Sequence, residues 1–339
     1  MYDIGAEAPH QAERPLAEPA YLAGPRVAVV IPCYRVSPFI LDVIARIGPE
    51  VTHIFVVDDR CPESSGALVE AECNDPRVKV IYHEVNQGVG GATLTGYAEA
   101  VQAGADAIIK LDGDGQMDPA LIPRFVAPLL NGDADYTKGN RFFYPHHLQN
   151  MPLVRALGNA ALSFMTKASS GYWDIMDPTN GFTCIHGRVA RELLKYSISS
   201  RYFFESDVLF RLNTFRAVVQ DVPMASHYGD ETSSLRIGKV IPEFLAKHAR
   251  NLAMRLFYNY LLRNFTVATL EFVVGLFLLM GGAWFGACEW YRGVRVGVAA
   301  SGGTVMLAAL PVLVGIQLLL AAIGYDIQTV PSRPVHSRL

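Results

Sequence analysis

The chain has 339 residues, of which 51% are apolar and 18% are charged. A soluble domain usually has about 25% charged residues, so this composition excludes a disordered or collagen-like chain and indicates an unusually apolar protein. The formal net charge of −3 excludes a whole-protein basic field for binding nucleic acid. Five cysteines, an odd number without a C-x-x-C pair, fit neither a disulfide framework nor a zinc site and indicate a reducing compartment.

The N-terminal segment is rich in proline, alanine and glutamate and contains no apolar core segment. It lacks the pattern of a secretory signal, and we therefore predict a flexible tail over residues 1–25. The domain that follows is expected to stay in the cytoplasm.

Short apolar runs alternate with helical stretches over about residues 26–235. Near-continuous apolar strands separated by helices predict an α/β domain with a mostly parallel sheet and helices on both of its faces. The predicted strands are Val27–Ile31, His53–Val57, Val78–Tyr82 and Ala107–Leu111.

Acidic residues follow two of these strands. The pair Asp58 and Asp59 follows the second strand, and the segment Asp112-Gly113-Asp114-Gly115-Gln116 follows the fourth. Ligands bind open α/β sheets at the carboxyl ends of the strands, so we expect both acidic groups in one site. Alternate carboxylates separated by small residues can turn toward one hard divalent cation. The alternative is a solvated turn of aspartate and glycine.

Two long apolar runs lie near the C-terminal end. Residues 267–288 contain one charged residue, Glu271, and residues 298–325 contain none. Each run exceeds the roughly 20 residues that cross a bilayer, which predicts two transmembrane helices. The alternative is a pair of buried core helices in a large soluble protein.

Basic residues flank the two runs unevenly, and the excess places both outer flanks on the cytoplasmic side. The cations before the first run are Lys239, Lys247, Arg250, Arg255 and Arg263, the turn carries Arg292 and Arg295, and the end of the chain adds Arg333 and Arg338. Residues 241–265 mix cations with large apolar residues, which predicts a helix in the lipid headgroup layer; the alternative is an amphipathic helix packed on the domain. We therefore predict a multi-pass protein of the inner (cytoplasmic) membrane. A cytoplasmic catalytic domain over 26–238 is followed by juxtamembrane amphipathic helices over 239–265. A transmembrane hairpin over 266–326 and a cytoplasmic tail over 327–339 complete the predicted arrangement.

Four motifs in order resemble the GT-A type domain of glycosyltransferase family two. They are Ile31-Pro32-Cys33-Tyr34, Val56-Val57-Asp58-Asp59, the turn Asn86-Gln87-Gly88-Val89-Gly90-Gly91-Ala92, and the D-x-D-x-Q form of the metal motif at Asp112, Asp114 and Gln116. Two later segments, 139–142 (Gly-Asn-Arg-Phe) and 177–182 (Asp-Pro-Thr-Asn-Gly-Phe), together with C-terminal membrane helices, resemble the polyprenyl-phosphate branch. That branch includes dolichyl-phosphate mannose synthase and bacterial undecaprenyl-phosphate glycosyltransferases.

The resemblance implies a role for individual residues. Asp112, Asp114 and Arg141 would be catalytic, and Asp114 and Gln116 would ligate Mg²⁺ or Mn²⁺. The residues implied to bind the donor nucleotide are Pro32, Tyr34, Asp58, Asp59, Gly88 and Asp112. Those implied to hold the acceptor or a phosphate are Asp177, Asp207, Ser233, Arg236 and Lys239.

The implied reaction is an inverting transfer of one sugar from a UDP- or GDP-linked donor to a polyprenyl phosphate on the cytoplasmic leaflet. A phosphate monoester, with a second pKa of about 6, is mostly ionised at neutral pH, so this acceptor needs no strong general base. The expected partners are a sugar nucleotide, a polyprenyl phosphate, the membrane and possible further copies of the chain, but no nucleic acid. The alternatives are a non-catalytic membrane scaffold and a glycosyltransferase that uses another acceptor.

Two further functions are less compatible with the sequence. A processive polysaccharide synthase would resemble proteins with a Q-x-x-R-W motif, which is absent. A nicotinamide dehydrogenase would need a third spaced glycine after Gly88 and Gly90, and its glycine turn would follow the first strand rather than the third.

Overall fold

A seven-stranded mixed sheet forms the centre of the catalytic part of the chain. The computed structural model describes residues 24–143, 153–225 and 237–339. The strands are β1 (Val27–Cys33), β2 (His53–Asp58), β3 (Val78–Tyr82), β4 (Ala107–Lys110), β5 (Tyr136–Asn140), β6 (Thr183–His186) and β7 (Val219–Pro223), in the order β3-β2-β1-β4-β6-β5-β7. All pairs are parallel except those made by β6, which runs antiparallel to both β4 and β5. The predicted mostly parallel α/β sheet is confirmed.

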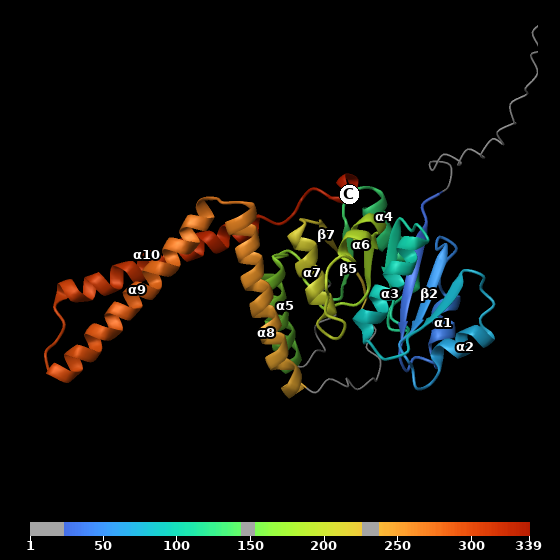
Figure 1. Ribbon diagram of the computed structural model, residues 1–339, viewed down its shortest axis with the longest axis horizontal. Helices are drawn as coiled ribbons and strands as arrows, with labels where there is room; N and C mark the ends of the chain where they lie inside the picture. Colours follow the sequence, from blue (N-terminus) through green and yellow to red (C-terminus); the bar gives the residue numbers. More distant parts are fainter. Residues whose placement is uncertain (1–23, 144–152, 226–236) are drawn as a thin grey trace, which may run out of the picture.

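Helices cover both faces of the sheet (Figure 1). Alternate residues of β1 point to opposite faces, so that Val29 joins one buried core and Val30 the other. The first core is closed by α1 (Ile40–Ala45), α2 (Ser65–Glu72) and α4 (Ile122–Leu130), which follows the short 3₁₀ turn η1 (Pro119–Leu121). The second is closed by α3 (Val89–Gln102), α6 (Gly187–Leu193) and α7 (Phe204–Thr214), while α5 (Leu153–Ser170) lies beside α8 (Ile237–Leu256).

Two long apolar helices extend away from the catalytic domain (Figure 1). They are α9 (Val267–Val296) and α10 (Gly302–Gln328), and the π-helical segment η3 (Phe257–Arg263) joins them to α8. Only 22% and 11% of their most apolar stretches are buried against protein, whereas core helices of a soluble protein would be mostly covered. By length and composition, both helices can span a membrane.

A buried ion pair joins the hairpin to the catalytic domain. Arg255 of α8 donates to Asp326 of α10 at 2.6 and 2.9 Å, and the indole N–H of Trp173 donates to the same carboxylate at 2.8 Å. Tyr260 donates a further hydrogen bond to Asp326. Arg255 is 3% exposed. It therefore faces protein, although the sequence pattern places it among the cations that face the lipid headgroups.

The C-terminal tail turns back onto the catalytic domain (Figure 1). The backbone N–H groups of Val335 and His336 donate to the buried carboxylate of Asp135 at 2.9 to 3.0 Å. The His336 ring stacks on His186 with centroids 4.2 Å apart. Both ends of the hairpin are therefore attached to the same domain.

Candidate active site

A cleft of about 410 Å³ opens at the carboxyl ends of β1, β2 and β4. Because Asp59 follows β2 and Asp112 follows β4, the predicted meeting of the two acidic groups at one site is confirmed. The residues that line the cleft are Pro32, Cys33, Tyr34, Val36, Asp59, Asn86, Gly88, Val89, Ala92, Asp112, Gly113, Asp114, Arg201 and Tyr202.

The acidic loop after β4 is shaped by its small residues. Gly115 has a φ of +77°, a conformation that favours glycine, and a Cβ at Gly113 would lie 3.1 Å from Val36. The backbone N–H of Gln116 donates to Asp114 at 3.0 Å. Asp112 and Asp114 both line the cleft, whereas Gln116 lies beside Asp114 on the same loop.

A buried lysine forms an ion pair with Asp112. Lys110, the last residue of β4, is 1% exposed and donates to Asp112 at 2.7 Å, and its ammonium lies 3.6 Å from Glu205 of α7. Burial by itself lowers the pKa of Lys110, but the neighbouring carboxylates Asp112 and Glu205 outweigh burial and raise it. Lys110 is therefore charged and holds two carboxylates close together. The signal for it in the sequence is a lysine inside an otherwise apolar strand.

The two aspartates after β2 have different environments. Asp58 accepts hydrogen bonds from the backbone of Cys61 at 2.6 Å and of Gly66 at 2.8 Å, and it does not line the cleft. Its carboxylate closes the loop before α2, and its predicted contact with the nucleotide stays a prediction. Asp59 lines the cleft and accepts from the backbone N–H groups of Gln87 at 2.8 Å and Gly88 at 2.7 Å.

The glycine turn before α3 is covered by a loop that the motifs did not indicate. The N–H groups of Gly90 and Gly91 donate to the carbonyl of Ser200 at 2.9 and 3.1 Å. This contact brings Arg201 and Tyr202, the two residues that follow Ser200, to the cleft. No local pattern marks these residues, since their place depends on how the chain returns to α3 from a distant part of the sequence.

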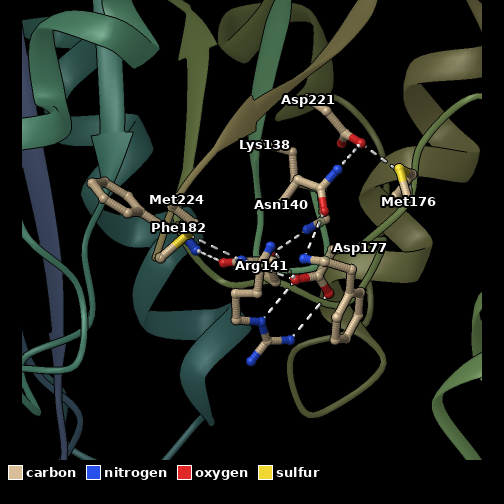
Figure 2. A network of polar contacts seen from close by, with 10 residues as sticks. Lys138, Asn140, Arg141, Met176, Asp177, Phe182, Asp221 and Met224 are labelled. Carbon is tan, nitrogen blue, oxygen red and sulfur yellow. Dashed lines mark hydrogen bonds and ion pairs between the residues drawn. The ribbon is translucent and has the colours of Figure 1, made fainter. Parts of the chain in front are cut away.

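Arg141 forms a bidentate ion pair with Asp177 (Figure 2). Its Nε lies 2.7 Å from Asp177 Oδ2 and its Nη2 lies 3.0 Å from Oδ1. Asp177 is fully buried and orients the Arg141 guanidinium through this ion pair. Its predicted contact with the acceptor or a phosphate stays a prediction.

A network of buried polar residues connects this ion pair to β5 and β7 (Figure 2). Lys138 donates to the carbonyl of Asn180, and Asn140 donates to Asp221 at 2.8 Å. Burial lowers the pKa of Lys138 to about 8 and raises the pKa of Asp221 to about 6. The two segments matched to the polyprenyl-phosphate branch, 139–142 and 177–182, thus lie together.

Gly181 links the network to the acidic loop. A Cβ at this position would lie 2.8 Å from both Asp112 Oδ2 and Lys110 Nζ. The carbonyl of Gly181 accepts from Lys110 at 3.2 Å. A larger residue at this position would therefore have to displace the ends of the Asp112 and Lys110 side chains.

The remaining predicted acceptor residues have varied positions. Asp207 is buried and accepts from the Ser199 N–H at 2.8 Å and from Asn251 at 3.2 Å, which makes it a structural link between α7 and α8. Its predicted contact with the acceptor or a phosphate stays a prediction. Ser233 and Arg236 lie outside the described residues. Lys239 lies in the first turn of α8, and its predicted contact with phosphate stays a prediction.

The donor set of the cleft fits a hard divalent cation that shares a phosphorylated substrate. Within the described ranges, no three His, Cys, Asp or Glu side chains group into a metal site. Mg²⁺ and similar ions are commonly held by one or two carboxylates together with substrate phosphates. Asp112 and Asp114 supply two carboxylates at one wall of the cleft, which is sufficient for that mode of binding.

Residues 28–194, which include β1 to β6 and the acidic loop, match the model of glycosyl transferase family 2. The chain carries a family 2 glycosyltransferase domain. A similar protein is the UDP-N-acetylglucosamine–dolichyl-phosphate N-acetylglucosaminyltransferase of Methanococcus voltae, 29% identical over 61% of this chain and 88% of that protein. Another is the undecaprenyl-phosphate mannosyltransferase of Micrococcus luteus, 25% identical over 66% of this chain and 93% of that protein.

A solved structure has a related fold. The family 2 glycosyltransferase domain superposes on glucosyl-3-phosphoglycerate synthase from Mycobacterium tuberculosis in complex with UDP with a TM-score of 0.51. The sequence identity is 19%, and the match covers 68% of this chain and 81% of that one. This likeness shows the fold, and the family and its named relatives show that the protein is a glycosyltransferase.

Proposed function

We propose that this glycosyltransferase transfers one sugar from a UDP- or GDP-sugar to a polyprenyl phosphate, with inversion and with Mg²⁺ or Mn²⁺. The observation that carries the proposal is a cleft with a two-aspartate wall in a domain fixed to an apolar hairpin by Arg255 and Asp326. The names of both relatives describe transfer to a polyprenyl phosphate. A lipid acceptor stays in the bilayer while its phosphate meets a water-soluble donor, which explains why one chain combines these parts.

The catalytic groups act mainly on the leaving group. The acceptor phosphate oxygen attacks C1 of the sugar, the bond from C1 to the donor β-phosphate oxygen breaks, and its electron pair leaves with the nucleoside diphosphate. Asp114 and Gln116 would hold the divalent cation, with Asp112 beside the donor, and the cation when bound would neutralise charge on the diphosphate. Lys110 keeps Asp112 in place, and Asp177 orients Arg141 for phosphate contact. The acceptor is already ionised, so no side chain has to remove a proton.

The membrane arrangement belongs to the same proposal. The division into a catalytic domain over 26–238, juxtamembrane helices over 239–265, a hairpin over 266–326 and a tail over 327–339 is supported by the bounds of α8, α9 and α10. The tail contacts the catalytic domain at Asp135, so both lie on one side of the membrane. The basic residues of the two outer flanks favour the cytoplasmic side.

The test is a panel of radiolabelled UDP- and GDP-sugars offered to the purified full-length protein with undecaprenyl or dolichyl phosphate. We expect label in the organic phase from one donor, only with Mg²⁺ or Mn²⁺. Asp114→Asn should abolish transfer with little change in melting temperature, while Asp133→Asn, at an exposed loop, should transfer normally. Saturable nucleotide binding without lipid product from any donor would point to another acceptor, and no nucleotide binding would point to a scaffold.

A further inference from the structure

The described lining of the cleft carries more acid than base. Three carboxylates, Asp59, Asp112 and Asp114, line it, and Arg201 is the one cation among the described lining residues. A nucleoside diphosphate would add negative charge to this cleft, and charges removed from water need partners of opposite sign. Arg141 is not among these lining residues, and two N–H groups of its guanidinium donate to Asp177.

The backbone of the glycine turn has little capacity left for phosphate. Free N–H groups at a helix start commonly bind phosphate. Here the N–H groups of Gln87 and Gly88 donate to Asp59, and those of Gly90 and Gly91 donate to the carbonyl of Ser200. These four donors already have protein partners, so a phosphate in this part of the cleft would gain most from a side-chain donor.

The loop that carries Arg201 is fixed by its backbone. The Ser199 N–H donates to Asp207 at 2.8 Å, and the Arg201 carbonyl accepts from Phe204 at 2.8 Å. A Cβ at Gly88 would lie 2.7 Å from the Ser200 carbonyl oxygen and 2.9 Å from Arg201 Cγ. The aliphatic part of the Arg201 side chain therefore lies against the Gly88 turn, and Arg201 lines the same cleft as Asp59 and Asp112.

The guanidinium itself is available. Among the described residues, Arg201 has neither a hydrogen bond nor an ion pair through its side chain. The backbone and the aliphatic part of the Arg201 side chain are fixed, whereas its guanidinium is not. Such an arginine is suited to bidentate binding of a phosphate.

We propose that Arg201 binds the diphosphate of the sugar nucleotide opposite the Asp112 and Asp114 loop. This inference rests on the function proposed above and names a contact that the motifs did not supply. As the bond from C1 to the β-phosphate oxygen breaks, the electron pair moves onto the diphosphate, and Arg201 stabilises that added charge. Arg201 is thus a substrate-binding residue that also favours departure of the leaving group.

The experiment compares full-length wild type, Arg201→Gln and Arg201→Lys in detergent, with Arg191→Gln as a matched control. Arg191 is an exposed arginine of α6 outside the cleft. Calorimetry with Mg²⁺ gives the Kd of UDP, GDP, uridine and guanosine for each protein. We expect Arg201→Gln to raise the Kd of the accepted diphosphate about tenfold or more without changing that of its nucleoside, since charge-assisted hydrogen bonds are strong. Arg201→Lys should recover part of the loss, and Arg191→Gln should match wild type.

Other outcomes separate the two proposals. If wild type binds a diphosphate and Arg201→Gln binds it equally well, the assignment of Arg201 is wrong and the proposed function stands. If only the KM for polyprenyl phosphate rises, Arg201 serves the acceptor, which also overturns the assignment to the donor. If wild type binds neither UDP nor GDP and makes no lipid product, the proposed function itself fails.

Discussion

Lys110 shows how a single buried charge can organise an active site. Its ammonium is 2.7 Å from Asp112 and 3.6 Å from Glu205. Lys110→Met would leave two carboxylates near each other without a cation, and removing one partner of a buried ion pair costs about 3–5 kcal/mol. We expect kcat to fall at least about tenfold, because Asp112 loses its support. Steady-state assays and thermal melting of the variant check both effects.

The controls for this prediction are lysines on two other strands of the sheet, β3 and β5. Lys79 of β3 pairs with Glu99 at the surface, and Lys79→Met should change stability by less than about 1 kcal/mol. Lys138→Met tests whether any buried lysine is equally important, since its pKa is lowered to about 8 and it donates to a carbonyl group. Retention of full activity by Lys110→Met would show that Asp112 needs no support.

At this scale, the sequence predicts residues inside motifs better than it predicts their roles. Asp59, Asp112 and Asp114 line the cleft as expected. Asp58 belongs to the same motif as Asp59, but its carboxylate closes a loop. The two residues differ because adjacent side chains at the end of a strand point to opposite faces of the sheet. Arg201 was missed, since its position depends on a contact between Ser200 and the α3 turn, which no local pattern encodes.

At the scale of elements, the Gly88 turn couples the covering loop to the cleft. Its φ is +86°, and an added Cβ would meet the Ser200 carbonyl at 2.7 Å. Gly88→Ala should therefore displace the loop that carries Arg201 and raise the Kd for nucleoside diphosphate. With a ψ of 167°, Gly88 lies in a backbone region that is essentially restricted to glycine, and a residue with a Cβ there costs about 1–3 kcal/mol, so the clash with Ser200 adds to an already large loss of stability.

Gly132 provides the matched control for this substitution. Its φ is +81°, and nothing lies within 4 Å of an added Cβ. Gly132→Ala should thus show the backbone cost without the steric one, and nucleotide binding should not change. Equal melting temperatures and equal Kd values for the two alanine variants would contradict the role given to the turn.

The elements themselves differ in how well the sequence predicts them. The strands β1 to β4 are mostly apolar runs between helices, and the pattern finds them. The strand β5, Tyr-Thr-Lys-Gly-Asn, is fully buried although it is mostly polar. Its polar groups are satisfied by a network that includes Asn180 and Asp221. Hydrophobic periodicity cannot detect such a strand, because its burial depends on partners distant in the sequence.

At the scale of the whole molecule, the Arg255–Asp326 ion pair joins α8 to the hairpin, and hydrogen bonds to Ala168 and from Trp173 connect this pair to the catalytic domain. Asp326→Asn leaves the buried guanidinium of Arg255 without its counter-charge, which should cost about 3–5 kcal/mol. We expect a lower melting temperature and slower transfer to a membrane-bound acceptor, while nucleotide binding at the distant cleft is retained. The double variant Arg255→Met/Asp326→Leu removes both charges and should recover part of the stability, because the Trp173 and Tyr260 donors still lose their acceptor. If Asp326→Asn alone melts like wild type, the ion pair does not hold the two parts together.

The interface between the catalytic domain and α8 should also make the molecule sensitive to acid. His248 of α8 is buried, its Nδ1 is 2.8 Å from the Ser169 hydroxyl, and burial lowers its pKa to about 4. The ordinary pKa of histidine is about 6.5, so between these values the unfolded chain binds a proton that the folded chain does not. Stability contributed by neutral His248 is therefore complete above about pH 6.5 and falls as the pH drops toward 4.

Two other groups titrate in the same range. Burial, followed by the neighbouring His336, lowers the pKa of His186 to about 4, which adds to the loss in acid. The raised pKa of Asp221, about 6, acts in the opposite direction, because the folded chain binds that proton more tightly. The contribution of His248 is isolated by comparing wild type with His248→Gln, which keeps a polar group near Ser169 but cannot titrate. Between pH 7.5 and 4.5 the melting temperature of wild type should fall more steeply than that of the variant, and parallel curves would show that His248 is not the acid-sensitive contact.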